Sequence, residues 1–155
     1  MAPSPPSPAI RLHLLGAIAA ASAMGCVLVL SLSTAWWPRP DLVMGSMVAG
    51  IVAFPCIVWT GTSGHIGAAG RRPPRVRAKR DRMPWIGGPT LFVLLPSGIV
   101  AWLLLPGDHV WVVPWIGVVR GIVALAVLTM MARSTRDGLA LTMPKRRALQ
   151  QRSSG

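Results

Sequence analysis

Four long runs of apolar residues divide the chain, and clusters of polar residues separate them. The runs extend over residues 12–35, 42–60, 85–105 and 111–132. A bilayer core about 30 Å thick needs roughly 20 apolar residues in an α-helix, so each run is long enough to cross it. The pattern therefore predicts four transmembrane helices.

The connectors between the runs predict how these helices pair. "WWPRPD" follows the first run and "LPGDH" follows the third, and both are short and rich in turn-forming residues. We expect two transmembrane hairpins, 12–62 and 85–132, joined by a basic loop over 63–84. We expect the Pro-rich start, 1–11, to be a disordered tail and 133–155 to be a basic tail. The predicted fold class is an all-α membrane protein.

Composition supports this class and excludes a soluble domain. The 155 residues are 52% hydrophobic and 13% charged, and the mean hydropathy is +0.54. A soluble domain of this length needs a mostly polar surface, which this composition does not supply. The two cysteines, Cys26 and Cys56, both lie in apolar runs without CxxC spacing. Neither a disulfide framework nor a zinc site is indicated.

Basic residues predict which side of the membrane each connector faces. The chain has 16 Lys and Arg against four Asp and no Glu, for a net charge of +12. Seven of the basic residues lie in the central loop: Arg71, Arg72, Arg75, Arg77, Lys79, Arg80 and Arg82. Six lie after the last run: Arg133, Arg136, Lys145, Arg146, Arg147 and Arg152. With Arg11, fourteen of the sixteen share one face, so the positive-inside rule places both termini in the cytoplasm.

The seven basic residues of the central loop are also the predicted docking site for lipid or a partner. Near an anionic membrane surface each basic residue contributes roughly 1 kcal/mol, so anionic lipid is the first expected partner. An acidic protein is the alternative. A nucleic-acid role needs aromatic or base-reading groups among the charges, and the segment from Arg71 to Arg82 has none. We therefore expect no nucleic-acid partner.

The first two runs carry small residues at four-residue spacing. The pairs are Ala21 with Gly25, Gly45 with Ala49, and Ser46 with Gly50. Small residues let helix backbones approach in lipid, so we expect the first helix to pack on the second. The first run is also longer than the 7–15 apolar residues of a signal peptide, and we expect it to be retained.

Neither catalysis nor a cofactor is indicated. The four aspartates lie in loops or tails, and the three histidines lie at or beyond the ends of the runs. A membrane haem needs axial ligands that project into the bundle. Met24, Cys26 and Met47 are soft ligands of the kind that bind Cu(I), but such residues are also ordinary packing groups in apolar helices. We expect no metal, no cofactor and no enzymatic activity.

Arg120 is the feature that the prediction of four transmembrane helices leaves unexplained. It lies within "WIGVVRGIVALAV", about 13 Å from the outer end of the fourth run, near the bilayer centre. A central Arg costs at least about 2.5 kcal/mol on insertion scales, so it must face the bundle, water or a partner. Pro55 and Pro96 each free the carbonyl four residues earlier, on Ile51 and Phe92. Arg120 either bonds to these carbonyls or contacts an anion: an acidic residue of another subunit, a partner's haem propionate or quinone, or an anionic substrate.

The first hairpin resembles a family of small inner-membrane proteins. "LLGAIAAAS", "WWPRPDLVMGSMVAG" and "CIVW", within Leu14 to Gly70, are similar to segments of the bacterial iron-uptake proteins that accompany siderophore-iron reductases. The second hairpin has no counterpart in that family. The resemblance implies an accessory subunit of the bacterial inner membrane, without catalysis of its own, that supports a haem-containing reductase.

Two functions are therefore expected from the sequence. The first is a non-enzymatic accessory or assembly subunit of a bacterial inner-membrane complex, with another membrane subunit as partner and a link to siderophore-iron uptake or reduction. The alternative is a small transporter or channel for an anion or metabolite that uses Arg120. A channel needs a polar stripe through several helices. Only Ser22, Ser46, Ser97 and scattered threonines supply one, so the accessory role leads.

Overall fold

The computed structural model is entirely helical over the part of the chain that it describes. It describes the backbone of residues 8–67 and 84–153, and the side chains of 11–62 and 84–136. Helix α1 (Pro8–Trp36) and helix α2 (Pro40–Gly67) form the first hairpin. The third span begins as a helix over 84–89, continues as the π-helical turn η1 (Thr90–Leu94) and ends as α4 (Leu95–Leu104).

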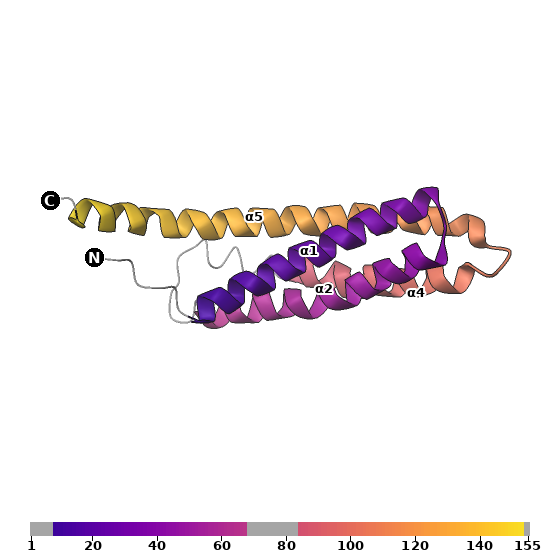
Figure 1. The fold of residues 1–155 in the computed structure, drawn as a ribbon, viewed down its shortest axis with the longest axis horizontal. Helices are drawn as coiled ribbons and strands as arrows, with labels where there is room; N and C mark the ends of the chain where they lie inside the picture. The colour runs from indigo at the N-terminus through magenta and orange to yellow at the C-terminus, as the bar shows by residue number, and fades with distance from the viewer. Residues whose placement is uncertain (1–7, 68–83, 154–155) are drawn as a thin grey trace.

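A short 3₁₀ turn, η2 (Val110–Val112), leads into the last and longest helix, α5 (Val113–Ser153). Figure 1 shows α5 lying along the bundle and continuing past the start of α1. The sequence placed the boundaries differently at two points. Helix α1 begins at Pro8, inside the expected disordered tail 1–11, and α5 continues as helix through most of the expected tail 133–155.

Four helical segments in the described residues are long and apolar enough to cross a membrane. They are Arg11–Trp36, Pro40–Thr62, Pro84–Leu104 and Val110–Arg136. The protein is therefore a multi-pass membrane protein, as predicted. The even number of spans leaves the start of α1 and the end of α5 at the same end of the bundle (Figure 1).

Turn chemistry closes both hairpins where the sequence predicts. Pro40 begins α2, and Asp41 in its first turn suits the positive end of the helix dipole. Arg39 also donates to the Asp41 carboxylate at 3.0 Å, an exposed ion pair that links the connector to α2. In the second hairpin the Gly107 amide donates to the Leu104 carbonyl oxygen at 3.3 Å. That bond closes the turn after α4.

Small residues form much of the interior, and large apolar residues cover the outside. Ala20, Ala53, Ala101 and Ala124 are almost fully buried, whereas many leucines, isoleucines and tryptophans are exposed. Lipid is as apolar as a leucine side chain, so helices in a membrane associate through close backbone packing rather than by hiding large side chains. The inverted pattern is what a membrane bundle requires.

Candidate polar site around Arg120

Arg120 lies in the interior of the bundle. Only 3% of its surface is exposed. Apolar cores lie on both sides of it: Val43, Ala101 and Val113 cluster on the outer side, and the larger group that includes Ala124 and Val127 clusters on the inner side. Arg120 therefore faces the other helices, and not a surface where a partner subunit packs.

Four hydrogen bonds connect the guanidinium to the three other spans. Nε donates to the Ser31 hydroxyl of α1 at 3.4 Å, and Nη2 donates to the Ser46 hydroxyl of α2 at 3.0 Å. Nη1 donates to the Leu94 carbonyl oxygen and to the Ser97 hydroxyl, at 3.3 Å from the hydroxyl. One side chain of α5 thus joins α1, α2 and the third span. We call Arg120, Ser31, Ser46, Ser97 and Leu94 the Arg120 cluster.

The serine hydroxyls orient their lone pairs toward the guanidinium. The Ser46 hydroxyl donates to the Val43 carbonyl oxygen at 2.9 Å, and the Ser97 hydroxyl donates to the Val93 carbonyl oxygen. A hydroxyl has one hydrogen and two lone pairs, so a serine that donates to its own helix still accepts from Arg120. Each such serine therefore links a backbone carbonyl to the cation: its hydrogen bonds to the carbonyl oxygen, and its own oxygen accepts from Arg120.

All four acceptors of Arg120 are neutral. The one ion pair between described residues is Arg39 with Asp41, in the exposed connector after α1. A buried charge without an opposite charge is costly unless hydrogen bonds compensate it. In the Arg120 cluster the hydroxyl and carbonyl dipoles do so, and no buried side-chain nitrogen or oxygen in the described part of the chain lacks a partner.

A glycine provides the space that the guanidinium occupies. A Cβ atom on Gly98 would lie 2.5 Å from Arg120 Nη1, 2.8 Å from Met47 Cγ and 3.2 Å from Arg120 Cζ. Real Cβ atoms do not approach other atoms so closely, so any larger residue at position 98 displaces the guanidinium. Gly98 is therefore part of the site although it has no polar group.

Two further glycines set the distance between α5 and α1. A Cβ atom on Gly117 would lie 2.7 Å from the Ser31 carbonyl oxygen and 2.9 Å from the Ala35 nitrogen. A Cβ atom on Gly121 would meet the Leu32 side chain at 2.6 Å. These glycines lie on either side of Arg120 in a Gly-x-x-x-Gly pattern, which lets helix backbones approach closely. The close approach brings Ser31 within reach of Arg120.

The structure answers part of the question that Arg120 raised in the sequence. Arg120 bonds within its own bundle, and one acceptor is a carbonyl of the proline-containing third span. That carbonyl belongs to Leu94, however, and neither Ile51 nor Phe92 accepts a bond from Arg120. Within the third span, the turn η1 explains why the acceptor is Leu94 and not Phe92. There the Leu95 amide donates to Thr90 O, five residues back, so the carbonyl pattern of a regular α-helix does not apply.

Sequence reasoning missed several members of the site. Ser46 was predicted to act in helix packing and in a sparse polar stripe, and Ser97 in that stripe alone. Ser31, Gly98, Gly117 and Gly121 were not identified. The Gly-x-x-x-Gly pattern around Arg120 can be seen in the sequence, and it could have identified the face of α5 that packs against another helix. Nothing in the sequence indicates which serine of α1 faces that point.

The other predicted contacts are mostly separate from this site. The seven basic residues of the central loop, Arg71 to Arg82, lie outside the described residues. Arg133 and Arg136 are exposed at the inner end of the fourth span. Met24 is fully buried while Cys26 is exposed, so these two soft ligands point to different sides of α1.

The glycines of the first hairpin differ in whether they bring α1 and α2 close together. Helix α1 does pack along α2, as predicted. At Gly25, however, an added Cβ would have no atom within 4 Å, so this glycine does not bring the helices together. Gly16 has that role instead, because a Cβ there would lie 2.9 Å from the Trp59 ring. A Cβ atom on Gly45 would lie 3.2 Å from Leu30 Cδ1 of α1.

Comparison of the chain with protein-family models, with curated proteins and with solved structures finds no match. The fold and the Arg120 cluster are therefore the basis for any functional statement. The resemblance of the first hairpin to siderophore-associated proteins stays a prediction.

Proposed function

We propose that this protein is a non-enzymatic accessory or assembly subunit of a bacterial inner-membrane complex. The observation that supports this proposal is the closure of the Arg120 cluster. The polar groups of the membrane interior bond to one another across all four spans. In this proposal, the hydrogen bonds among these groups serve to fix the arrangement of the helices.

The character of the buried groups also favours a non-catalytic role. Among the described side chains, Arg120 is the one buried residue that carries a charge. A guanidinium holds its proton too tightly to act as a general acid or base. A subunit built in this way acts by binding a partner and positioning it in the membrane.

The resemblance of the first hairpin suggests which complex this is. It points to a membrane reductase that contains haem and takes part in the use of iron from siderophores. In this proposal the chain supplies no ligand to the haem. It packs beside the reductase and stabilises it.

A second candidate is a transporter or channel for a small anion. The observation that favours it is the neutrality of every acceptor around Arg120. An anion that replaced one of the serine hydroxyls would compensate the charge more fully than a dipole does. The cluster would then have to open, because Arg120 is almost fully enclosed.

One preparation separates the two candidates. The tagged full chain is purified from its native membrane in mild detergent, its partners and haem absorption are measured, and the isolated chain is then tested for chloride flux in liposomes. The accessory proposal expects a second membrane protein at a fixed ratio and no flux. A monomer without a partner would contradict the proposal. Chloride flux by that monomer, lost in Arg120→Met, would establish the transporter.

A further inference from the structure

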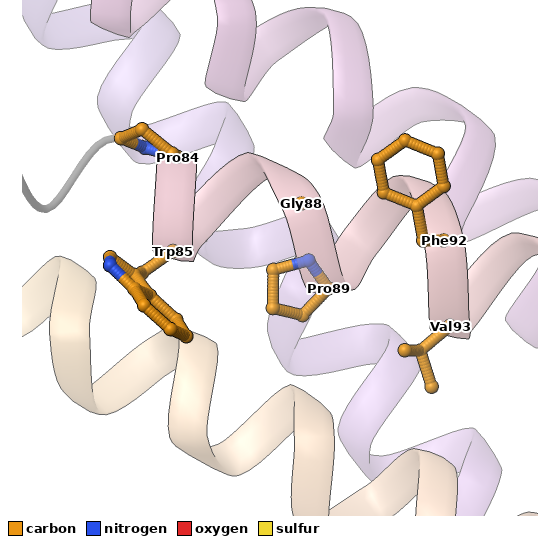
Figure 2. A pocket seen from close by; sticks show the side chains of 6 residues that line it. All are labelled: Pro84, Trp85, Gly88, Pro89, Phe92 and Val93. Atoms are coloured by element: carbon orange, nitrogen blue, oxygen red, sulfur yellow. The ribbon is translucent and has the colours of Figure 1, made fainter.

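A groove lies on the surface of the third span, in the residues that precede Leu94 of the Arg120 cluster. It has a volume of about 370 Å³ and is lined by Pro84, Trp85, Gly88, Pro89, Phe92 and Val93. Figure 2 shows these residues along one helical stretch, with a neighbouring helix beside Trp85. The groove is open on one side, and its walls are almost entirely apolar.

The local sequence explains why the surface is hollow here. Gly88 has no side chain, and the rings of Pro84 and Pro89 are compact. Trp85 and Phe92 stand out as walls, with 67% and 75% of their surfaces exposed. A Cβ atom added to Gly88 would have no atom within 4 Å, so the space above this glycine is open.

The depth of the groove places it at the inner boundary of the membrane. It begins at Pro84, the first residue of the third span, and the fourth span ends at the same end of the bundle, at Arg136. Counted at about 1.5 Å per residue from the turn between the two spans, Arg133 and Arg136 lie roughly one to two helical turns beyond the level of Trp85. Both arginines are exposed. The apolar groove therefore lies roughly one to two helical turns deeper in the membrane than the positive charges of Arg133 and Arg136.

We propose that this groove binds one acyl chain of an anionic phospholipid, whose headgroup lies near Arg133 and Arg136. An acyl chain needs no hydrogen-bond partner, which matches walls made of proline, glycine, valine and aromatic carbon. A peptide segment would bury backbone N–H and C=O groups that these walls cannot satisfy. Basic residues at the cytoplasmic ends of membrane helices bind anionic headgroups, and tryptophan is typical of this depth.

Two neighbouring glycines provide the test. Gly88→Leu places a side chain in the groove, and its Cβ would have no atom within 4 Å. Gly87→Leu is the matched control: position 87 is equally open, but it does not line the groove. Both variants add the same side chain to the same helix, so they differ only in whether the groove is filled.

The full-length protein and both variants are purified in detergent and titrated with phosphatidylglycerol or phosphatidylcholine. Native mass spectrometry counts the lipids retained, and thermal unfolding measures the stabilisation that binding confers. We expect wild type and Gly87→Leu to retain one phosphatidylglycerol molecule and to unfold at higher temperature with it. Gly88→Leu should lose both effects. Equal lipid retention by the three proteins would overturn the site. Equal retention of the two lipids by wild type would overturn the assignment to an anionic headgroup.

Discussion

At the residue scale, the Arg120 cluster keeps a charge in the membrane without an opposite charge. A central Arg costs at least about 2.5 kcal/mol on insertion scales. Four hydrogen bonds from a charged donor offset this cost, because each is stronger than a bond between neutral groups. Ser46 and Ser97 strengthen the arrangement, since each accepts from Arg120 while it donates to its own helix. The cluster thus specifies a single arrangement of the helices more than it adds net stability.

This view predicts opposite effects for two substitutions of Arg120. Arg120→Met removes the charge and leaves a flexible side chain of similar length, and the Ser46 and Ser97 hydroxyls keep their own donations. We expect the unfolding temperature in detergent to stay the same or to rise. Arg120→Lys keeps the charge, but an ammonium cannot reproduce the geometry of the guanidinium fork. We expect it to lose roughly 1–3 kcal/mol of stability.

Thermal and denaturant unfolding of the two variants beside wild type provide the measurement. If Lys were tolerated and Met strongly destabilising, the net contribution of Arg120 to stability would be positive and the interpretation as a specificity element would be wrong.

Gly98 gives a second prediction at this scale. A methyl group at position 98 overlaps Arg120 Nη1 and Met47 Cγ, so Gly98→Ala must displace the guanidinium from its acceptors. We expect a loss of roughly 1–3 kcal/mol, the usual cost of overpacking. The control is Gly25→Ala in α1, where an added Cβ meets nothing within 4 Å. There the higher helix propensity of alanine should leave stability unchanged or slightly increased. Equal effects of the two variants on the unfolding temperature would argue against a tight fit at Gly98.

At the scale of whole helices, two features bring the cluster together. The glycines of α5 allow α1 to approach closely, and the π-helical turn η1 changes the carbonyl pattern of the third span just before Ser97. Pro96 is the second residue after this turn, and in a regular α-helix its ring clashes with the carbonyl four residues earlier. A wider turn accommodates that ring. Single π turns inside helices are frequent at functional sites.

The glycines of α5 predict graded effects. At Gly117 an added methyl group meets backbone atoms of Ser31 and Ala35, which move only if the whole helix moves. At Gly121 it meets the Leu32 side chain, which can change rotamer. We expect Gly117→Ala to destabilise the bundle by about 2 kcal/mol or more and Gly121→Ala by less, since flexible side chains relieve overpacking more easily.

An engineered disulfide between α1 and α5 would also test how closely these two helices pack. The direct measurement, however, is unfolding of the two alanine variants in one detergent. If Gly121→Ala lost more stability than Gly117→Ala, backbone contact would not be what limits the packing of α5 on α1.

The sequence predicted the helices well and the polar contacts only in part. Run length and the positions of proline and glycine placed the four spans, because the bilayer fixes how many apolar residues a span needs. The same reasoning identified Arg120 and gave two alternatives for its contacts, the carbonyls of Ile51 and Phe92 or an anion. For Phe92 the error has a physical cause: the prediction assumed regular α-helical hydrogen bonding in the third span, and η1 interrupts it. The choice of Ser31 and Ser46 depends on helix rotation, which nearly uniform apolar spans do not encode.

At the scale of the whole molecule, the distribution of charge and the bundle geometry together predict the orientation of the protein in the membrane. The start of α1 and the end of α5 lie at the same end of the bundle (Figure 1). In the sequence, fourteen of the sixteen basic residues precede the first apolar run, lie between the second and third runs or follow the fourth, and Arg39 lies between the first and second. The positive-inside rule therefore places that end in the cytoplasm and the turn that contains Asp108 outside it.

Two variants, each with one added cysteine, test this orientation in spheroplasts. Asp108→Cys adds a thiol in the exposed turn after α4, and Thr135→Cys adds one at the exposed inner end of the fourth span. Neither substitution changes the number of Lys or Arg, which are the residues that set orientation. The native Cys26 and Cys56 lie within the spans, where a charged maleimide does not reach, so wild type is the control. We expect labelling of Asp108→Cys in intact spheroplasts and of Thr135→Cys only after permeabilisation. The reverse pattern would place the basic segments outside and remove the anionic inner-leaflet lipid from the proposed groove.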